Sequence, residues 1–192
     1  MSNDNCRLLV ATDIYGPTDA FCQWVDAILP SCWDKQVISP YSENIHYSDE
    51  PIAYQAFLQT GGLDNFKQKL TIALKMQSQS TVALGFSAGA AALYYVLSSY
   101  DKAHHTQHFY GFYPGQIRFF TDKATLIPST LYFPNSEPHF DVDTVIKALS
   151  MHANVTCNKT EYLHGFMNPY SRNYDTQGQS DFTQVLINRL AK

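Results

Sequence analysis

One segment of the sequence constrains the fold more than any other. The strand-like run Thr81-Val82-Ala83-Leu84 is followed at once by Gly85-Phe86-Ser87-Ala88-Gly89, and a segment of small residues suited to a helix begins at Ala88. A strand that reverses directly into a helix forces the central residue into a strained backbone conformation, and side chains at either glycine position would collide. The segment therefore predicts that Ser87 stands exposed at a sheet edge, beside the Ala88 N–H and the positive end of a helix.

Short apolar runs alternate along the chain with longer segments whose apolar residues recur every three or four positions. This rhythm is typical of a parallel sheet covered by helices, an α/β fold. Strands are expected at 8–11, 36–39, 81–84, 108–111, 129–133 and 155–163. Helices are expected at 21–28, 63–74, from 88 onward, at 142–149 and at 182–190. The polar segment 41–62 is expected to be rich in loops.

The 192 residues are expected to form a single domain spanning 1–192. No repeat and no Pro/Gly/Ser-rich linker divides the chain, and 45% of its residues are apolar, enough to exclude a disordered protein. Only 16% are charged and 14% are aromatic, a low charge and a high aromatic share.

Charge and composition also exclude several partners. The formal net charge is −4 and no Lys/Arg cluster is present, so nucleic acid is not expected to bind. The sequence contains no run of about 20 apolar residues, so no membrane-spanning helix is expected. Cys6, Cys22, Cys32 and Cys157 show no CxxC pairing and are expected to be free thiols. The polar N-terminal residues 1–5 do not resemble a signal peptide, so we expect a cytoplasmic protein.

A serine nucleophile needs a base on another strand-to-helix loop at the same edge of the sheet. His164 fits best among seven histidines, because it follows the last expected strand directly and precedes Gly165. Five of the other histidines are placed less well. Three precede a strand and so lie at the opposite edge, one ends a helix, and one lies in a polar loop before the nucleophile (His104, His105, His108, His152 and His46).

The base in turn needs a carboxylate, expected on the loop that follows the intervening strand 129–133. Glu137 lies nearest the strand end among the acids of that loop. Asp141 is the alternative, although it also suits the N-cap of the following helix. The alternation of His139, Asp141 and Asp143 has no matching ligand cluster elsewhere, so no metal is expected.

Three segments resemble the dienelactone hydrolase-type α/β hydrolases. Thr12-Asp13-Ile14-Tyr15-Gly16 is similar to the family's Q-E-I-F-G, Gly85 to Gly89 matches the nucleophile elbow, and His164-Gly165-Phe166-Met167-Asn168-Pro169 matches H-G-F-x-N-P. Tyr110-Gly111 resembles the family's Y-G at a strand end. The resemblance implies a minimal α/β-hydrolase fold without a lid domain, with a mostly parallel sheet of about six strands and helices on both faces.

The resemblance also implies roles for individual residues. It implies Glu137 as the acid and the N–H of Ile14 as a second oxyanion donor beside Ala88. Asp13 occupies the position of a family acid, and Ser87 stands where dienelactone hydrolases proper have cysteine. Arg172 is the only arginine expected near the site.

The sequence therefore predicts a serine hydrolase acting on a small carboxylic ester, lactone or thioester, without a cofactor. The alternative is an inactive protein of the same fold that binds or regulates. Aromatic residues next to the expected strand ends predict a cleft walled by rings and suited to neutral or aromatic esters: Tyr15, Phe86, Phe112, Tyr113, Phe166 and Tyr170.

Overall fold

The computed structural model describes residues 6–42, 44–99 and 105–191. His104 and residues 1–5, which entered the expectations about the base and the compartment, lie outside these ranges.

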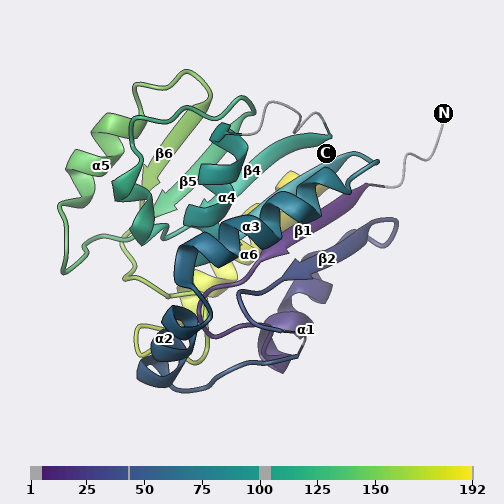
Figure 1. The fold of residues 1–192 in the computed structure, drawn as a ribbon, viewed down its shortest axis with the longest axis horizontal. Coiled ribbons are helices and arrows are strands. Elements are labelled where there is room, and N and C mark those ends of the chain that lie inside the picture. The colour runs from purple at the N-terminus through teal and green to yellow at the C-terminus, as the bar shows by residue number, and fades with distance from the viewer. Residues whose placement is uncertain (1–5, 43, 100–104, 192) are drawn as a thin grey trace.

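In these ranges, six parallel strands form one sheet in the order β2-β1-β3-β4-β5-β6 (Figure 1). They are β1 (Arg7–Ala11), β2 (Asp34–Ile38), β3 (Thr81–Phe86), β4 (Thr106–Phe112), β5 (Ser129–Phe133) and β6 (Val155–Lys159). Every strand pair is parallel, from β1 with β2 to β5 with β6. The α/β fold and the sheet of about six strands are thus confirmed. Because the strands are parallel, their carboxyl ends lie at one edge of the sheet.

Some strand ends differ from the expected ones. β4 continues to Phe112, which pairs with Phe86 of β3, so Tyr110-Gly111 lies inside the strand rather than at its end. The strand thus runs one residue beyond its expected end at Gly111. β6 is shorter than the expected strand 155–163 and ends at Lys159, which pairs with Phe133, the last residue of β5.

Within the described residues, five α-helices lie between the strands and a sixth follows β6. They are α1 (Asp19–Ile28), α2 (Glu50–Gln59), α3 (Gly62–Lys75), α4 (Ala88–Ser99), α5 (Val142–Leu149) and α6 (Thr176–Leu190). Helix α2 was not expected, because 41–62 was predicted to be rich in loops. Asp49 caps it by accepting the N–H of Ile52, and Pro51 suits its first turn. Only Ala53 and Phe57 of α2 are buried, so its apolar stripe is short.

The two faces of the sheet carry different cores. Alternate strand residues such as Leu9, Ala83 and Phe109 pack with α2, α3, α4 and α5. The intervening residues, such as Val10 and Phe86, pack with α1 and α6. Figure 1 shows α3 in front of the sheet and α6 behind it. Burial on both faces explains the unbroken apolar runs of the central strands.

Two further findings bear on the expectations. No helix of the described ranges has both the length and the apolar character needed to cross a membrane. All four cysteines are free.

Candidate active site

The turn between β3 and α4 has the geometry of a nucleophile elbow. Ser87 has a positive φ of 49°, the left-handed conformation that costs energy in a residue with a side chain. A Cβ on Gly85 would lie 2.7 Å from Cα of Ala90, and one on Gly89 would lie 2.2 Å from the carbonyl oxygen of Thr12. Both glycines are therefore required by close backbone contacts, as the turn predicts.

His164 reaches Ser87 from the loop after β6. Its Nε2 lies 2.9 Å from Oγ of Ser87. The side chain of Asn173 donates a hydrogen bond of 2.9 Å to the main-chain oxygen of His164, and the ring of Tyr113 lies 5.1 Å from the imidazole, centroid to centroid. The imidazole is therefore held next to the serine hydroxyl by its main chain and by a neighbouring ring.

Glu137, and not Asp141, contacts the other nitrogen of His164. Oε1 of Glu137 lies 2.5 Å from Nδ1, and the glutamate side chain is only 8% exposed. Asp141 instead caps α5 by accepting the N–H of Thr144 at 2.6 Å, a bond that holds the pKa of its carboxyl below the usual range. The structure thus places Ser87, His164 and Glu137 in one hydrogen-bonded line.

Two main-chain donors lie near this line. The N–H groups of Ala88 and Ile14 donate to no other described residue. They lie on adjoining segments, because Gly89 packs against the main-chain oxygens of Ala11 and Thr12 at the end of β1. Unpaired N–H groups at a helix start and a neighbouring loop are suited to binding an oxyanion.

Tyr41, which the sequence did not single out, holds the Ile14 loop in place. Its hydroxyl lies 2.5 Å from the carbonyl oxygen of Ile14 and 2.8 Å from that of Ala53 in α2. The side chain is buried, and burial raises the pKa of the phenol above its usual value. Only the tertiary fold brings this tyrosine, 27 positions away in the sequence, to Ile14.

Asp13 is buried beside the same loop. Its Oδ2 accepts a hydrogen bond of 2.6 Å from Asn168, and its Oδ1 accepts one of 2.9 Å from the main chain of Tyr15. Burial raises the pKa of the carboxyl to about 6, against the lowering effect of these bonds. Asp13 is almost fully buried, and its hydrogen bonds join the loop after β1 to the loop after β6.

The aromatic residues do not wall an open cleft. Phe86, Phe112, Tyr113 and Phe166 are at most 1% exposed, and Tyr15 is 4% exposed. Phe86 packs edge to face on Phe21 and Trp24 of α1, and Phe166 packs on Phe182 of α6. The choice of Phe86 and Phe166 as substrate-contacting residues is thus wrong, because their strand and loop positions turn them into the core. Among the six rings only Tyr170, at 40%, is well exposed.

The structure places a second arginine near the site. Arg172, the arginine expected there, is exposed and forms no ion pair with a described residue. Arg118, in the 3₁₀ helix η1 (Gly115–Phe119) after β4, lies near the same glycine, Gly115, as do Glu137 and His164. Sequence reasoning missed Arg118 because η1 has no periodic signal that would place its side chains.

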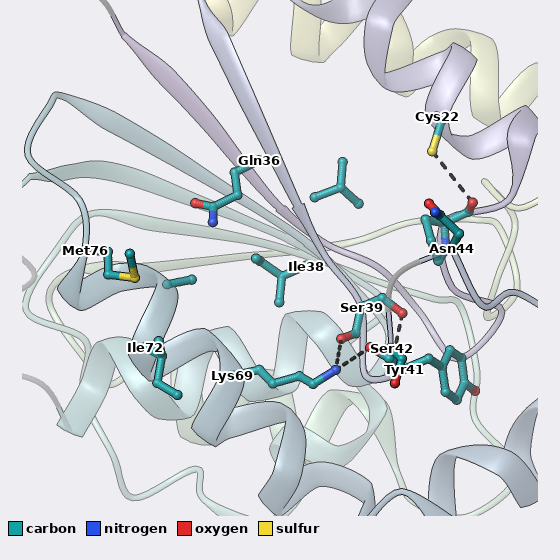
Figure 2. Close-up of a pocket in the computed structure, with 13 residues that line it drawn as sticks. Cys22, Gln36, Ile38, Ser39, Tyr41, Ser42, Asn44, Lys69, Ile72 and Met76 are labelled. Atoms are coloured by element: carbon teal, nitrogen blue, oxygen red, sulfur yellow. Dashed lines mark hydrogen bonds between the residues drawn. The ribbon is translucent and has the colours of Figure 1, made fainter.

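A cavity of about 540 Å³ lies apart from this line of residues (Figure 2). It runs along the edge strand β2 and α3, with Ile38 and Met76 among its lining residues. Figure 2 shows Lys69 reaching the end of β2, where its ammonium group donates to the main-chain oxygens of Ser39 and Tyr41. None of Ser87, Glu137 and His164 lines this cavity. Within the described ranges, no three His, Cys, Asp or Glu side chains cluster as a metal site would require.

Comparison with known proteins adds one sequence relative. No family model matches the chain. The uncharacterized protein YczH of Bacillus subtilis (strain 168) is 27% identical over 169 residues, which cover 85% of this chain and 82% of that protein.

Solved structures show the fold. A dienelactone hydrolase-like promiscuous phosphotriesterase, P91, from metagenomic libraries has a TM-score of 0.66 at 12% identity, covering 100% of this chain and 87% of its own. Est1E from Butyrivibrio proteoclasticus has a TM-score of 0.63 at 9% identity (98% and 88% covered). The dienelactone hydrolase from Anabaena variabilis ATCC 29413 has a TM-score of 0.62 at 12% identity (96% and 84% covered). The expected fold, that of dienelactone hydrolase-like α/β hydrolases, is confirmed.

Proposed function

We propose that this chain, which has the α/β-hydrolase fold, is a serine hydrolase that cleaves a small carboxylic ester, lactone or thioester. The observation that carries the proposal is the hydrogen-bonded line from Ser87 through His164 to Glu137. Serine is a weak nucleophile alone, and a histidine oriented by a carboxylate is the arrangement that activates it.

In the proposed reaction, Oγ of Ser87 attacks the acyl carbon while Nε2 of His164 takes the hydroxyl proton. The carbonyl oxygen becomes an oxyanion, which the N–H groups of Ala88 and Ile14 stabilise. The carbon–oxygen or carbon–sulfur bond to the leaving group then breaks, and His164 gives its proton to that group. Water attacks the acyl-enzyme by the same route in reverse, which frees the acid and restores Ser87. Every step uses protein groups and water, so the chemistry calls for no cofactor.

Glu137 has a distinct role in this scheme. Its contact with Nδ1 of His164 fixes the tautomer that leaves Nε2 free to accept the serine proton, and it stabilises the imidazolium that forms. An inactive binding protein, the alternative function, would not require this contact. The 2.5 Å separation between Glu137 and His164 therefore favours the enzyme.

The test combines labelling with turnover. A fluorophosphonate probe is expected to label Ser87, and the protein is expected to hydrolyse p-nitrophenyl acetate. Ser87→Ala should lose both, whereas Ser180→Ala, which removes an exposed hydroxyl from α6, should keep both. Turnover that survives unchanged in Ser87→Ala, with no label on Ser87, would overturn the proposal.

A further inference from the structure

Arg118 is the charged residue whose place in the structure most directly extends the proposed function. A Cβ placed on Gly115 would lie 3.5 Å from Cε1 of His164 and 3.7 Å from Oε1 of Glu137. The same point is 3.9 Å from Nη1 of Arg118. The guanidinium, the imidazole and the carboxylate therefore each have an atom within 4 Å of one point beside Gly115, which has no side chain to fill it.

Most of the hydrogen-bonding capacity of Arg118 is unused by the described residues. Nη1 donates a bond of 2.6 Å to the main-chain oxygen of Gly115, and no described carboxylate lies within 4 Å of the guanidinium. The flat group lies over two rings, 4.3 Å from that of Phe119 and 5.2 Å from that of Phe140. An arginine has five N–H donors in a planar fork that fits a carboxylate, so this one can accept an anionic partner without losing a protein bond.

The proposed reaction fixes which part of a substrate meets this cation. His164 gives its proton to the leaving group, so the leaving group departs beside the imidazole. Nη1 of Arg118 and Cε1 of the same imidazole lie within 4 Å of one point beside Gly115. We propose that Arg118 recognises a carboxylate carried by the leaving group, so that the preferred substrates are esters of an alcohol or phenol bearing an anionic substituent. This inference rests on the proposed serine hydrolase function and narrows its substrate class.

The alternative role for Arg118 is to hold neighbouring residues in place without contacting the substrate. Through Phe140, which pairs with Glu137 in an isolated antiparallel bridge, its packing supports the loop that carries the acid. A purely positioning role lowers the turnover of every ester by the same factor, whereas recognition changes the ratio between an anionic ester and its neutral match. The selectivity ratio therefore separates the two roles.

The test uses two pairs of esters with the purified protein. In the first pair, 4-acetoxybenzoate and methyl 4-acetoxybenzoate differ in the charge of the leaving phenol. In the second, mono-4-nitrophenyl adipate and 4-nitrophenyl hexanoate differ in the charge of the acyl chain. Each kcat/KM is divided by the rate of uncatalysed hydrolysis. The wild type is expected to favour 4-acetoxybenzoate, and Arg118→Gln should reduce that preference roughly tenfold to hundredfold, the scale of a lost charge-assisted hydrogen bond.

Arg189→Gln, which removes an exposed arginine from the end of α6, should leave the preference unchanged. An equal preference in wild type and Arg118→Gln would overturn the inference, as would an equal loss for all four esters. A change confined to the acyl-side pair would overturn the assignment to the leaving group, and loss of the preference in Arg172→Gln alone would overturn the assignment to Arg118. If no ester is hydrolysed and Ser87 is not labelled by a fluorophosphonate, the proposed function fails and this inference fails with it.

Discussion

Asn168 donates a hydrogen bond of 2.6 Å to the buried carboxyl group of Asp13, a residue 155 positions away in the sequence. The bond joins the loop after β1, which carries Ile14, to the loop after β6, which carries His164. Both partners are at most 3% exposed. The pair therefore fixes the distance between the proposed oxyanion donor and the proposed base, although neither member touches Ser87.

Asp13→Asn is expected to remove a pH dependence of stability between about pH 4 and pH 6. Burial raises the folded-state pKa to about 6 from an unfolded value of 3.8, so the folded state binds the proton more tightly. This contribution to stability is fully present below pH 3.8 and is lost as the pH rises to 6. The free energy of unfolding of wild type relative to Asp13→Asn should thus fall by about 3 kcal/mol across this range.

Urea unfolding at several pH values measures this difference. Asp64→Asn, which neutralises an exposed aspartate of α3, is the matched control. Its free energy of unfolding should change with pH in the same way as that of wild type. A wild-type minus Asp13→Asn difference that stays constant from pH 4 to pH 6 would contradict the expectation.

Substitution of Glu137 should affect activity, whereas substitution of Asp141 should affect stability. Glu137→Gln is expected to lower kcat for p-nitrophenyl acetate by roughly 10³–10⁴ with little loss of stability, because glutamine cannot hold the required tautomer of His164. Asp141→Ala should keep kcat within about threefold but lose about 1 kcal/mol of stability, because it removes the cap of α5. Steady-state kinetics and urea unfolding of both variants check this, and the reverse pattern would assign the acid to Asp141.

The neighbourhood of Ser87 and His164 could be predicted because it depends on topology. Residues that follow the ends of parallel strands meet at one edge of the sheet, whatever the details of packing. The choice between Glu137 and Asp141 could not be made from the residues alone, since both acids lie on one short loop. The isolated bridge between Glu137 and Phe140 folds that loop so that the first acid reaches His164.

The residues missed by sequence reasoning act through contacts between distant segments. Tyr41 and Arg118 lie in a loop and a 3₁₀ helix, where no periodicity indicates direction. The aromatic rings were misjudged for a related reason. A strand alternates its side chains between two faces, and both Phe86 and Phe112 point to the face that α1 and α6 cover. Their closeness to Ser87 in the sequence therefore did not bring their rings to the surface around the site.

Gly89→Ala should destabilise the fold strongly. The new Cβ would lie 2.2 Å from the main-chain oxygen of Thr12 and 2.7 Å from that of Ala11, and backbone atoms cannot move aside cheaply. A loss of about 3 kcal/mol or more in the free energy of unfolding is expected. Gly115→Ala is the control, because its Cβ would have no neighbour nearer than 3.5 Å and should leave stability nearly unchanged. Equal stability of the two variants in urea would show that the elbow does not depend on this contact.

Tyr41→Phe should lower kcat about tenfold while leaving KM within about twofold. The change removes the hydroxyl that holds the carbonyl of Ile14, so the N–H of Ile14 is less well aimed at the oxyanion. The expected loss is smaller than the roughly 10²–10³ in kcat that removal of an oxyanion donor costs, because the donor itself remains. Since the oxyanion exists only in the transition state, ground-state binding should change little.

Tyr47→Phe is the matched control, because its ring contacts that of Tyr41 at 4.9 Å and no hydrogen bond joins its hydroxyl to Ile14. The affinity of an alkyl boronic acid, whose adduct with Ser87 mimics the tetrahedral species, should fall in parallel with kcat for Tyr41→Phe alone. If KM rises while kcat and boronic acid affinity stay unchanged, Tyr41 supports substrate binding rather than the oxyanion donor.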